Sequence, residues 1–144
     1  MKKILLIHGP ILNMIAKRDT KHYGVYTLPE LVLAVKEEAK KHGCIVAAFQ
    51  SNHEGRLIDI IQKYAGTAQG IIINPGALTH YSYALHDALV DAGLPTVEVH
   101  LSNVNEREPW RKISVTAPAC KKVISGKKIH GYLEAVNYLA PSLS

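Results

Sequence analysis

The stretch from Thr96 to Arg111, TVEVHLSNVNEREPWR, joins a short β-branched run to several side chains that can move protons or bind anions. The β-branched run predicts a strand that is buried on both faces. Side chains alternate along a strand, so Glu98 and His100 should point to the same side, about 7 Å apart along the chain. His100 could then act as a general acid, with Glu98 or a neighbouring group fixing its tautomer. The alternative is a structural histidine where a strand ends in a polar loop.

Tyr23 is a second candidate for proton transfer. It lies in residues 9–26, which show neither helical nor strand periodicity, and the residues around it are basic: Lys17, Arg18, Lys21 and His22. Nearby cations favour the phenolate form of a tyrosine, which would make Tyr23 a general base. A connection this long between a strand and a helix is usually functional, often as a lid. The alternative is a surface tyrosine in a basic loop.

Several further residues could bind an anionic ligand. Asn74-Pro75-Gly76 and Ser102-Asn103 can present backbone N–H groups and side-chain amides to a carboxylate, although the same residues are common in plain turns. Arg107 and Arg111 are four residues apart, would share one helical face and could clamp an anion, or could simply be solvated. His80 and His86 flank the expected start of a helix, where either can be an ordinary polar surface residue.

The elements that would position these residues alternate along the chain. Buried strands are expected at residues 4–7, 44–49, 70–73 and from 96 onward, with Val123 and Ile124 as the core of a fifth. Amphipathic helices lie between them, and Thr27 with Glu30 forms a capping box at the start of the first. The buried faces of the helices should be Leu28, Leu31, Val32, Val35 and Ala39; Leu57, Ile58, Ile61, Tyr64 and Ala65; Leu85, Ala88, Leu89 and Ala92; and Ile129, Leu133, Val136 and Leu139.

This alternation predicts the α/β class, with a five-stranded parallel sheet in a flavodoxin-like three-layer sandwich. Residues 1–144 should form one domain, with residues 9–26 as a lid loop at the active site. In open α/β sheets, ligands bind beyond the carboxyl ends of the strands. The polar residues that follow the expected strands should therefore meet at one edge: His8-Gly9-Pro10, Ser51-Asn52-His53, Asn74-Pro75-Gly76-Ala77, His100 to Asn103, and Ser125-Gly126.

Composition narrows the function classes. The formal charge is +5 with 20% charged residues, and basic residues do not cluster in a run, which argues against nucleic acid as a partner. Cys44 and Cys120 lie in apolar stretches, as expected of a reducing, cytoplasmic setting. The N-terminal apolar run is too short for a signal peptide and no stretch is long enough for a membrane span. The sequence contains no HExxH, P-loop, GxGxxG or GxSxG motif, so no metal or cofactor is expected.

Along nearly the whole chain, the sequence resembles the type II 3-dehydroquinate dehydratases. The matching blocks are GPxLN at Gly9 to Asn13, Arg18-x4-Tyr23-Gly24, QSNHEG at Gln50 to Gly55, IIINPGAxTHYS at Ile71 to Ser82, VEVHLSN at Val97 to Asn103, RExxR at Arg107 to Arg111, and Gly131-Tyr132. The order and spacing of these blocks together make the resemblance specific.

The resemblance implies dehydration of 3-dehydroquinate to 3-dehydroshikimate, without metal or cofactor, in the shikimate pathway or in quinate breakdown. Tyr23 matches the base that removes a proton from C2, Arg18 matches the arginine that activates it, and His100 matches the acid that helps the C1 hydroxyl to leave. The other matched positions are substrate-binding Asn74, His80, Leu101, Ser102 and Arg111, and supporting Asn13, Glu98 and Arg107. Asp87 matches an acidic residue that a neighbouring subunit contributes, in a family that assembles trimers into dodecamers.

The chain departs from the family pattern at several positions. Ile11 stands where an active-site asparagine is usual, and this change leaves open a slowed enzyme or a non-catalytic relative that binds a cyclic hydroxy-acid. The remaining departures are Ala16 for glycine, Asp19 for glutamate, His86 for arginine, Asn105 for histidine and Lys128 for glycine.

Overall fold

The computed structural model describes residues 1–103 and 106–143. In this part of the chain, parallel strands form one five-stranded sheet in the order β2-β1-β3-β4-β5. The strands are β1 (Lys2–His8), β2 (Cys44–Gln50), β3 (Gly70–Asn74), β4 (Thr96–His100) and β5 (Lys122–Ser125). The predicted flavodoxin-like sheet is confirmed. The departure noted at Asn105 lies outside the described residues.

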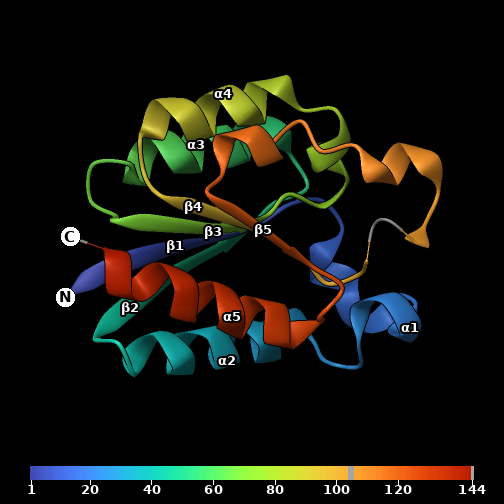
Figure 1. Cartoon of the computed structure of the whole chain (residues 1–144), viewed down its shortest axis with the longest axis horizontal. Coiled ribbons are helices and arrows are strands. Elements are labelled where there is room, and N and C mark those ends of the chain that lie inside the picture. The colour runs from blue at the N-terminus through green and yellow to red at the C-terminus, as the bar shows by residue number, and fades with distance from the viewer. Residues whose placement is uncertain (104–105, 144) are drawn as a thin grey trace.

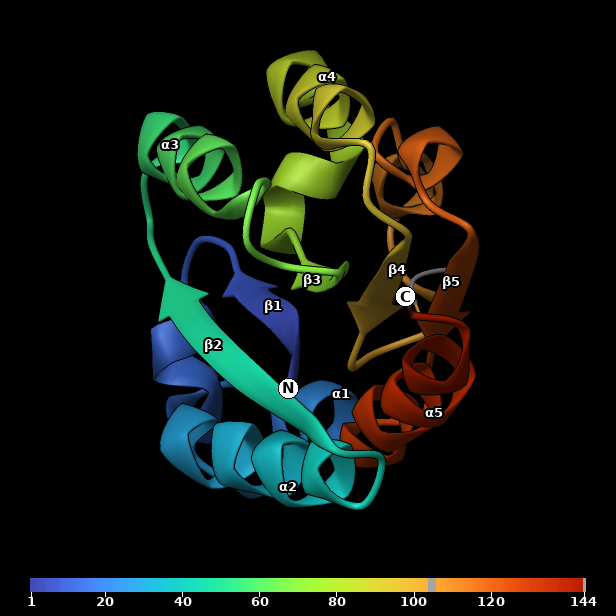
Figure 2. The ribbon, with the colours of Figure 1, turned by 90° about the vertical axis from the view of Figure 1, so that its left-hand side faces the viewer.

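Helices cover both faces of the sheet (Figure 1). One layer contains α2 (Leu28–Lys40) and α5 (Ile129–Leu139), and the other contains α3 (Glu54–Tyr64) and α4 (Tyr83–Ala92). Figure 2 shows the two layers on opposite sides of the twisted strands. Shorter helices connect these elements: η1 (Leu12–Lys17), α1 (Thr20–Tyr23), η2 (Gly76–His80), η4 (Pro109–Lys112), η5 (Ala117–Ala119) and η6 (Ala140–Ser142). No helix in the described ranges is both long and apolar enough to cross a membrane.

The start of α2 follows from its sequence. The Thr27 hydroxyl accepts a hydrogen bond from the Glu30 backbone N–H at 3.2 Å, and the Glu30 carboxylate accepts one from the Thr27 N–H at 3.1 Å. This is the predicted capping box, which satisfies two of the backbone donors that a helix start leaves unpaired. Pro29, in the first turn, costs no hydrogen bond there.

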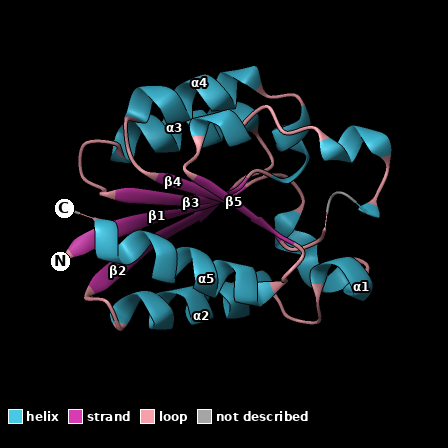
Figure 3. Cartoon of the chain, viewed as in Figure 1, coloured by secondary structure: helices cyan, strands magenta, loops and turns pink. Residues whose placement is uncertain are grey.

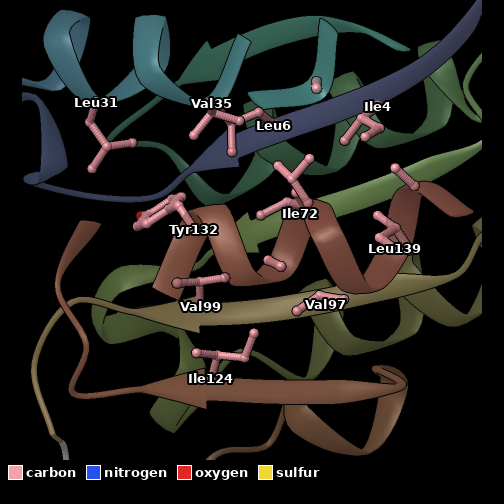
Figure 4. Packing of buried hydrophobic residues seen from close by; sticks show 14 of the residues in the cluster. Ile4, Leu6, Leu31, Val35, Ile72, Val97, Val99, Ile124, Tyr132 and Leu139 are labelled. Carbon is pink, nitrogen blue, oxygen red and sulfur yellow. The ribbon is translucent and has the colours of Figure 1, made fainter. Parts of the chain in front are cut away.

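The sheet separates two apolar clusters. Alternate residues of β1 point to opposite faces, so Ile4 and Leu6 pack with α2 and α5, whereas Leu5 and Ile7 pack with α3 and α4. Figure 4 shows the first cluster, in which Tyr132 on α5 lies among the strand residues. Because helices cover both faces, the strands carry continuous apolar runs instead of alternating ones.

Three details of the sequence analysis were wrong. Residues 9–26 are not irregular, because η1 and α1 lie within them, and Leu12 and Ile15 are buried there. The buried face of α3 also includes Ile60, which the prediction omitted, and Ile58 is only partly buried against the same cluster. Val123 is 44% exposed, because β5 is an edge strand that the helices cover incompletely.

Candidate active site

A pocket opens where the strands end, beside η1, α1 and η4. In Figure 3 these short helices gather at the carboxyl ends of the strands. Most of the candidate residues line the pocket: Arg18, Tyr23, Asn74, His80, His100, Leu101, Ser102, Arg107 and Arg111. The rest of the lining is Pro10, Ile11, Leu12, Gly76 and Ala77. Parallel topology therefore brings together residues that are far apart in the sequence, as the strand-end argument predicted.

Tyr23 is held by arginines from two separate segments. The Arg18 Nη2 donates to the Tyr23 phenol oxygen at 2.7 Å, and the Arg107 Nη1 donates to the same oxygen at 2.5 Å. The Arg18 guanidinium also lies 4.0 Å from the centroid of the tyrosine ring. Tyr23 is only 7% exposed and packs with the apolar cluster that contains Ile15 and Leu101. Two cationic donors on one phenol oxygen fix the position of that oxygen at the pocket and place positive charge beside it.

Glu98 and His100 form a hydrogen-bonded pair behind the pocket. The His100 Nε2 lies 2.7 Å from the Glu98 Oε2, and Glu98 is fully buried. Burial alone would raise the pKa of the Glu98 carboxyl, but hydrogen bonds from His100, Thr116 and Thr79 outweigh it and hold this pKa below its ordinary value. Because an ionised carboxylate only accepts hydrogen bonds, His100 must carry a proton on Nε2. This leaves Nδ1 as the ring nitrogen that can exchange a proton with a ligand.

The turns after β1 and β3 touch each other and orient Asn74. The Gly9 N–H donates to the Asn74 carbonyl at 2.8 Å, and a Cβ on Gly9 would lie 2.2 Å from the Pro75 carbonyl oxygen, so only glycine fits there. The Asn74 Oδ1 accepts from the Gly76 N–H at 3.0 Å, and its Nδ2 donates to the Tyr132 hydroxyl at 2.9 Å. The Asn74 amide is therefore fixed at both ends, with a second N–H left on Nδ2 for a ligand.

His8 contacts Tyr132, the residue that binds the Asn74 amide. Its Nε2 lies 3.0 Å from the Tyr132 hydroxyl, and its Nδ1 has no partner in the described part of the chain. Burial lowers the pKa of His8 to about 3, so its ring is neutral near pH 7. His8 is thus a structural histidine in contact with the residue that holds Asn74.

Arg107 and Arg111 do not share a helical face, contrary to the prediction. The helix η4 begins only at Pro109, and Glu108 before it has an extended backbone. Arg107 consequently reaches Tyr23, whereas Arg111 is paired with the Glu108 carboxylate and lies 4.1 Å from the centroid of the Trp110 ring. Both arginines nevertheless line the pocket.

His80 lies on the same side of the pocket as η4. Its Nδ1 is 2.7 Å from the Ile113 carbonyl oxygen, and its ring contacts Trp110 edge-on with the centroids 5.1 Å apart. Burial lowers the pKa of His80 below its ordinary value, and the nearby His100 and Arg111 act in the same direction. A neutral His80 is suited to a hydrogen bond with a ligand, not to neutralising an anion.

Ile11 has a left-handed backbone, with φ of 72° and ψ of −9°. The Ile11 N–H donates to the Asn52 Oδ1 at 2.9 Å, and the side chain is 53% exposed at the pocket. The turn after Pro10 therefore leaves the Ile11 side chain half-exposed at the edge of the pocket. A β-branched residue is rare in this conformation, whereas asparagine, the family's usual residue here, adopts it readily.

Two candidates lie apart from the pocket. Asn13 is exposed on η1 and does not line it. Asp87 lies on α4 with a side chain that is 75% exposed, where its carboxylate contacts the His86 ring at 3.0 Å, so it does not reach the pocket of its own chain. The described residues contain no group of three or more His, Cys, Asp or Glu side chains that could hold a metal ion.

The reasoning from sequence missed the groups that surround Glu98. Thr79, Ser114 and Thr116 place their hydroxyls against its carboxylate. Thr79 lies in a block that was noted, but Ser114 and Thr116 belong to a segment without regular periodicity. Only tertiary contact, through the hydrogen bond from the Val115 N–H to the Thr79 carbonyl at 2.7 Å, brings them to the site.

Comparisons with known proteins agree with this geometry. Residues 2–140 match the family model of class II dehydroquinases. The 3-dehydroquinate dehydratase of Clostridium beijerinckii is 51% identical over 95% of this chain and 94% of its own length. The 3-dehydroquinate dehydratase of Thermotoga maritima is 45% identical over 98% of this chain and 96% of its own length. A catabolic 3-dehydroquinase of Aspergillus clavatus is 46% identical over 96% and 93%.

Solved structures give the same result. The type II dehydroquinase of Butyrivibrio crossotus superposes with a TM-score of 0.93 at 46% identity, covering 96% of this chain and 97% of the other. A 3-dehydroquinate dehydratase-like protein of Bifidobacterium longum, at 30% identity over 98% and 97%, gives 0.73. The chain therefore belongs to the class II dehydroquinase family, the hydro-lyases that dehydrate 3-dehydroquinate.

Proposed function

We propose that this chain dehydrates 3-dehydroquinate with Tyr23 as the base and His100 as the acid. The observation that carries the proposal is the arginine pair on the Tyr23 phenol oxygen, in the same pocket as the His100–Glu98 pair. The phenolate of Tyr23 takes a proton from C2 of the substrate, and the electron pair of that C–H bond forms an enolate. Collapse of the enolate breaks the C1–O bond, and His100 gives a proton to the departing hydroxyl, which leaves as water.

The binding of the substrate follows from the charges and amides of the pocket. Its carboxylate and hydroxyls need cationic and neutral donors, and the pocket offers Arg111, Ser102 and the second N–H of Asn74. Leu101 and His80 complete this group of proposed substrate contacts. Arg18 and Arg107 serve the base instead, because both donate to Tyr23.

Three further parts of the proposal concern the surroundings of the site. Residues 9–26, with Asn13 at the surface, act as a lid that carries Tyr23. The exposed Asp87 reaches the pocket of a neighbouring subunit in a dodecamer of trimers. The reaction takes place in the cytoplasm, in aromatic biosynthesis or in quinate breakdown. A monomeric mass by light scattering, in an active sample, would rule out the assembly.

The test follows the absorbance of the conjugated enone product after mixing with 3-dehydroquinate. Tyr23→Phe should lose turnover by several orders of magnitude but keep most of its affinity, because the phenol oxygen transfers the proton and other groups bind. Tyr26→Phe is the matched control: Tyr26 is three residues away and its hydroxyl accepts from the Ile129 N–H at 2.7 Å, outside the pocket. Near-normal kcat in Tyr23→Phe would remove Tyr23 from the mechanism.

Ile11 supports a second candidate function. An apolar side chain at the pocket where the family has an amide fits a relative that binds a cyclic hydroxy-acid without turning it over. Calorimetric binding of 3-dehydroquinate without turnover at high protein concentration would favour this second function over the first.

A further inference from the structure

We propose that three hydroxyl-bearing residues, Thr79, Ser114 and Thr116, are positioning residues that keep Glu98 ionised and thereby fix the ring of His100 for its work as the acid. We refer to them as the hydroxyl cluster. The inference rests on the proposed role of His100 as the acid. It adds the groups that keep Glu98, the hydrogen-bond partner of His100, ionised.

The contacts define the cluster. The Glu98 Oε2 lies 2.9 Å from the Thr79 hydroxyl and 3.0 Å from the Ser114 hydroxyl, and the Thr116 hydroxyl donates to Oε1. Oε2 also accepts from His100, so among the described residues Oε2 has three hydrogen-bond contacts and Oε1 has one, from Thr116. Thr79 and Thr116 are almost completely buried, which keeps water from replacing them.

The hydroxyls also contact one another. The Thr79 oxygen lies 2.7 Å from that of Ser114 and 2.8 Å from that of Thr116, and the Ser114 and Thr116 oxygens are 3.3 Å apart. Each hydroxyl has a single proton, so the cluster cannot satisfy all of these contacts and those to Glu98 at once. A charged acceptor attracts donors more strongly than a neutral one, so the protons turn toward Glu98 when it is ionised. The cluster therefore stabilises the carboxylate over the carboxylic acid.

Other titratable groups face Glu98 from neighbouring elements. His100 lies on the same strand, His80 on η2, and Cys120 after η5. Burial and the Glu98 charge together raise the pKa of the Cys120 thiol to about 12, so it is neutral near pH 7. Burial likewise favours neutral His80. His100 and the hydroxyl cluster are therefore the groups that decide the charge of Glu98 near neutral pH.

The loss of a hydroxyl from the cluster should change the pH at which Glu98 takes up a proton, and the contacts give the direction of that change. The hydroxyl cluster contacts the Glu98 carboxylate, so it stabilises the protein most when that carboxylate is charged. Protonation of Glu98 at lower pH removes the charge that the cluster stabilises. Removing a hydroxyl should therefore move the acid step, which is the protonation of Glu98, to higher pH.

Thr116→Val is the sharpest variant, because it keeps the shape of the side chain and removes the hydroxyl that serves Oε1. NMR spectra of protein labelled with ¹⁵N-histidine follow the His100 ring through a pH titration, with His100→Gln identifying its resonances. A hydrogen bond to a charged group is worth a shift of about one to two pH units in the acid step. Thr116→Ser keeps a hydroxyl at this position, so its acid step should lie at the pH of the unaltered protein.

The matched control is Thr96→Val. Thr96 is a buried threonine on the same strand as Glu98, but its hydroxyl donates to the Leu94 carbonyl and not to Glu98. No shift in Thr116→Val, or equal shifts in the Val and Ser variants, would overturn the proposal. If Thr116→Val does not fold, Ser114→Ala gives the same test at a partly exposed position. The NMR reading needs no turnover, so an inactive protein that shows the shift would contradict the proposed function and leave this inference standing.

Discussion

Replacing Ile11 by asparagine should raise kcat/KM for 3-dehydroquinate without loss of the fold. The backbone φ of 72° costs a β-branched residue about 1–2 kcal/mol, and asparagine avoids most of that cost. The isoleucine side chain is 53% exposed, so its removal forfeits roughly half of the 1.5–3 kcal/mol that full burial is worth. These terms nearly cancel, and the free energy of unfolding should change by less than about 1 kcal/mol.

The rate should change far more than the stability. Ile11 lines the pocket with Tyr23 and His100, and one preorganised donor in such a site contributes on the order of 10²–10³-fold. Asn13 cannot already supply this amide, because it is exposed and does not line the pocket. We therefore expect a gain in kcat/KM of up to about 10²-fold, measured by the appearance of the enone.

Ile11→Gly is the matched control for this gain. Glycine relieves the backbone strain but provides no amide, so its kcat/KM should stay near that of the parent. A comparable gain in both variants would assign the effect to strain or bulk. Unchanged or lower kcat/KM in a folded Ile11→Asn protein would refute the reasoning and show that Ile11 is adapted to this chain's own loop or substrate.

Two further substitutions test the stability of the elements around the site. Lys128→Gly should raise the free energy of unfolding in urea by about 1–2 kcal/mol, because Lys128 has φ of 52° and ψ of −136°, a region suited to glycine; Lys128→Ala keeps the Cβ and should change little, and equal effects of the two would contradict the assignment of strain. Tyr132→Phe should lower that free energy by about 1–3 kcal/mol, because the buried His8 and Asn74 lose their shared partner. Unaltered urea stability of Tyr132→Phe would show that these hydrogen bonds contribute nothing net.

The sequence predicted the framework of the molecule better than the local detail of the site. Apolar runs and helical periodicity identified the strands and the main helices, and parallel topology then required the strand ends to converge. Periodicity could not show the short helices within residues 9–26, because their stability comes from burying Leu12 and Ile15 against the core.

The remaining differences have the same origin. The left-handed backbone at Ile11 is accompanied by a hydrogen bond to Asn52, which is distant in sequence. Ser114 and Thr116 show no pattern of their own, and they acquire a role only because their segment pairs with Thr79. Arg107 and Arg111 had the spacing of a helix, but Arg107 contacts Tyr23, which is distant in sequence, whereas Arg111 pairs locally with Glu108.

The two apolar clusters on either face of the sheet have an evolutionary consequence. The cluster beneath α2 and α5 contains Tyr23 and Leu101, which line the pocket, whereas in the described part of the chain no member of the cluster beneath α3 and α4 does so. Substitutions in the α2–α5 layer therefore disturb stability and chemistry together, and selection should restrict them most. The α3–α4 layer should drift in sequence more freely, except at Asp87, which the proposed assembly brings to the pocket of a neighbouring subunit.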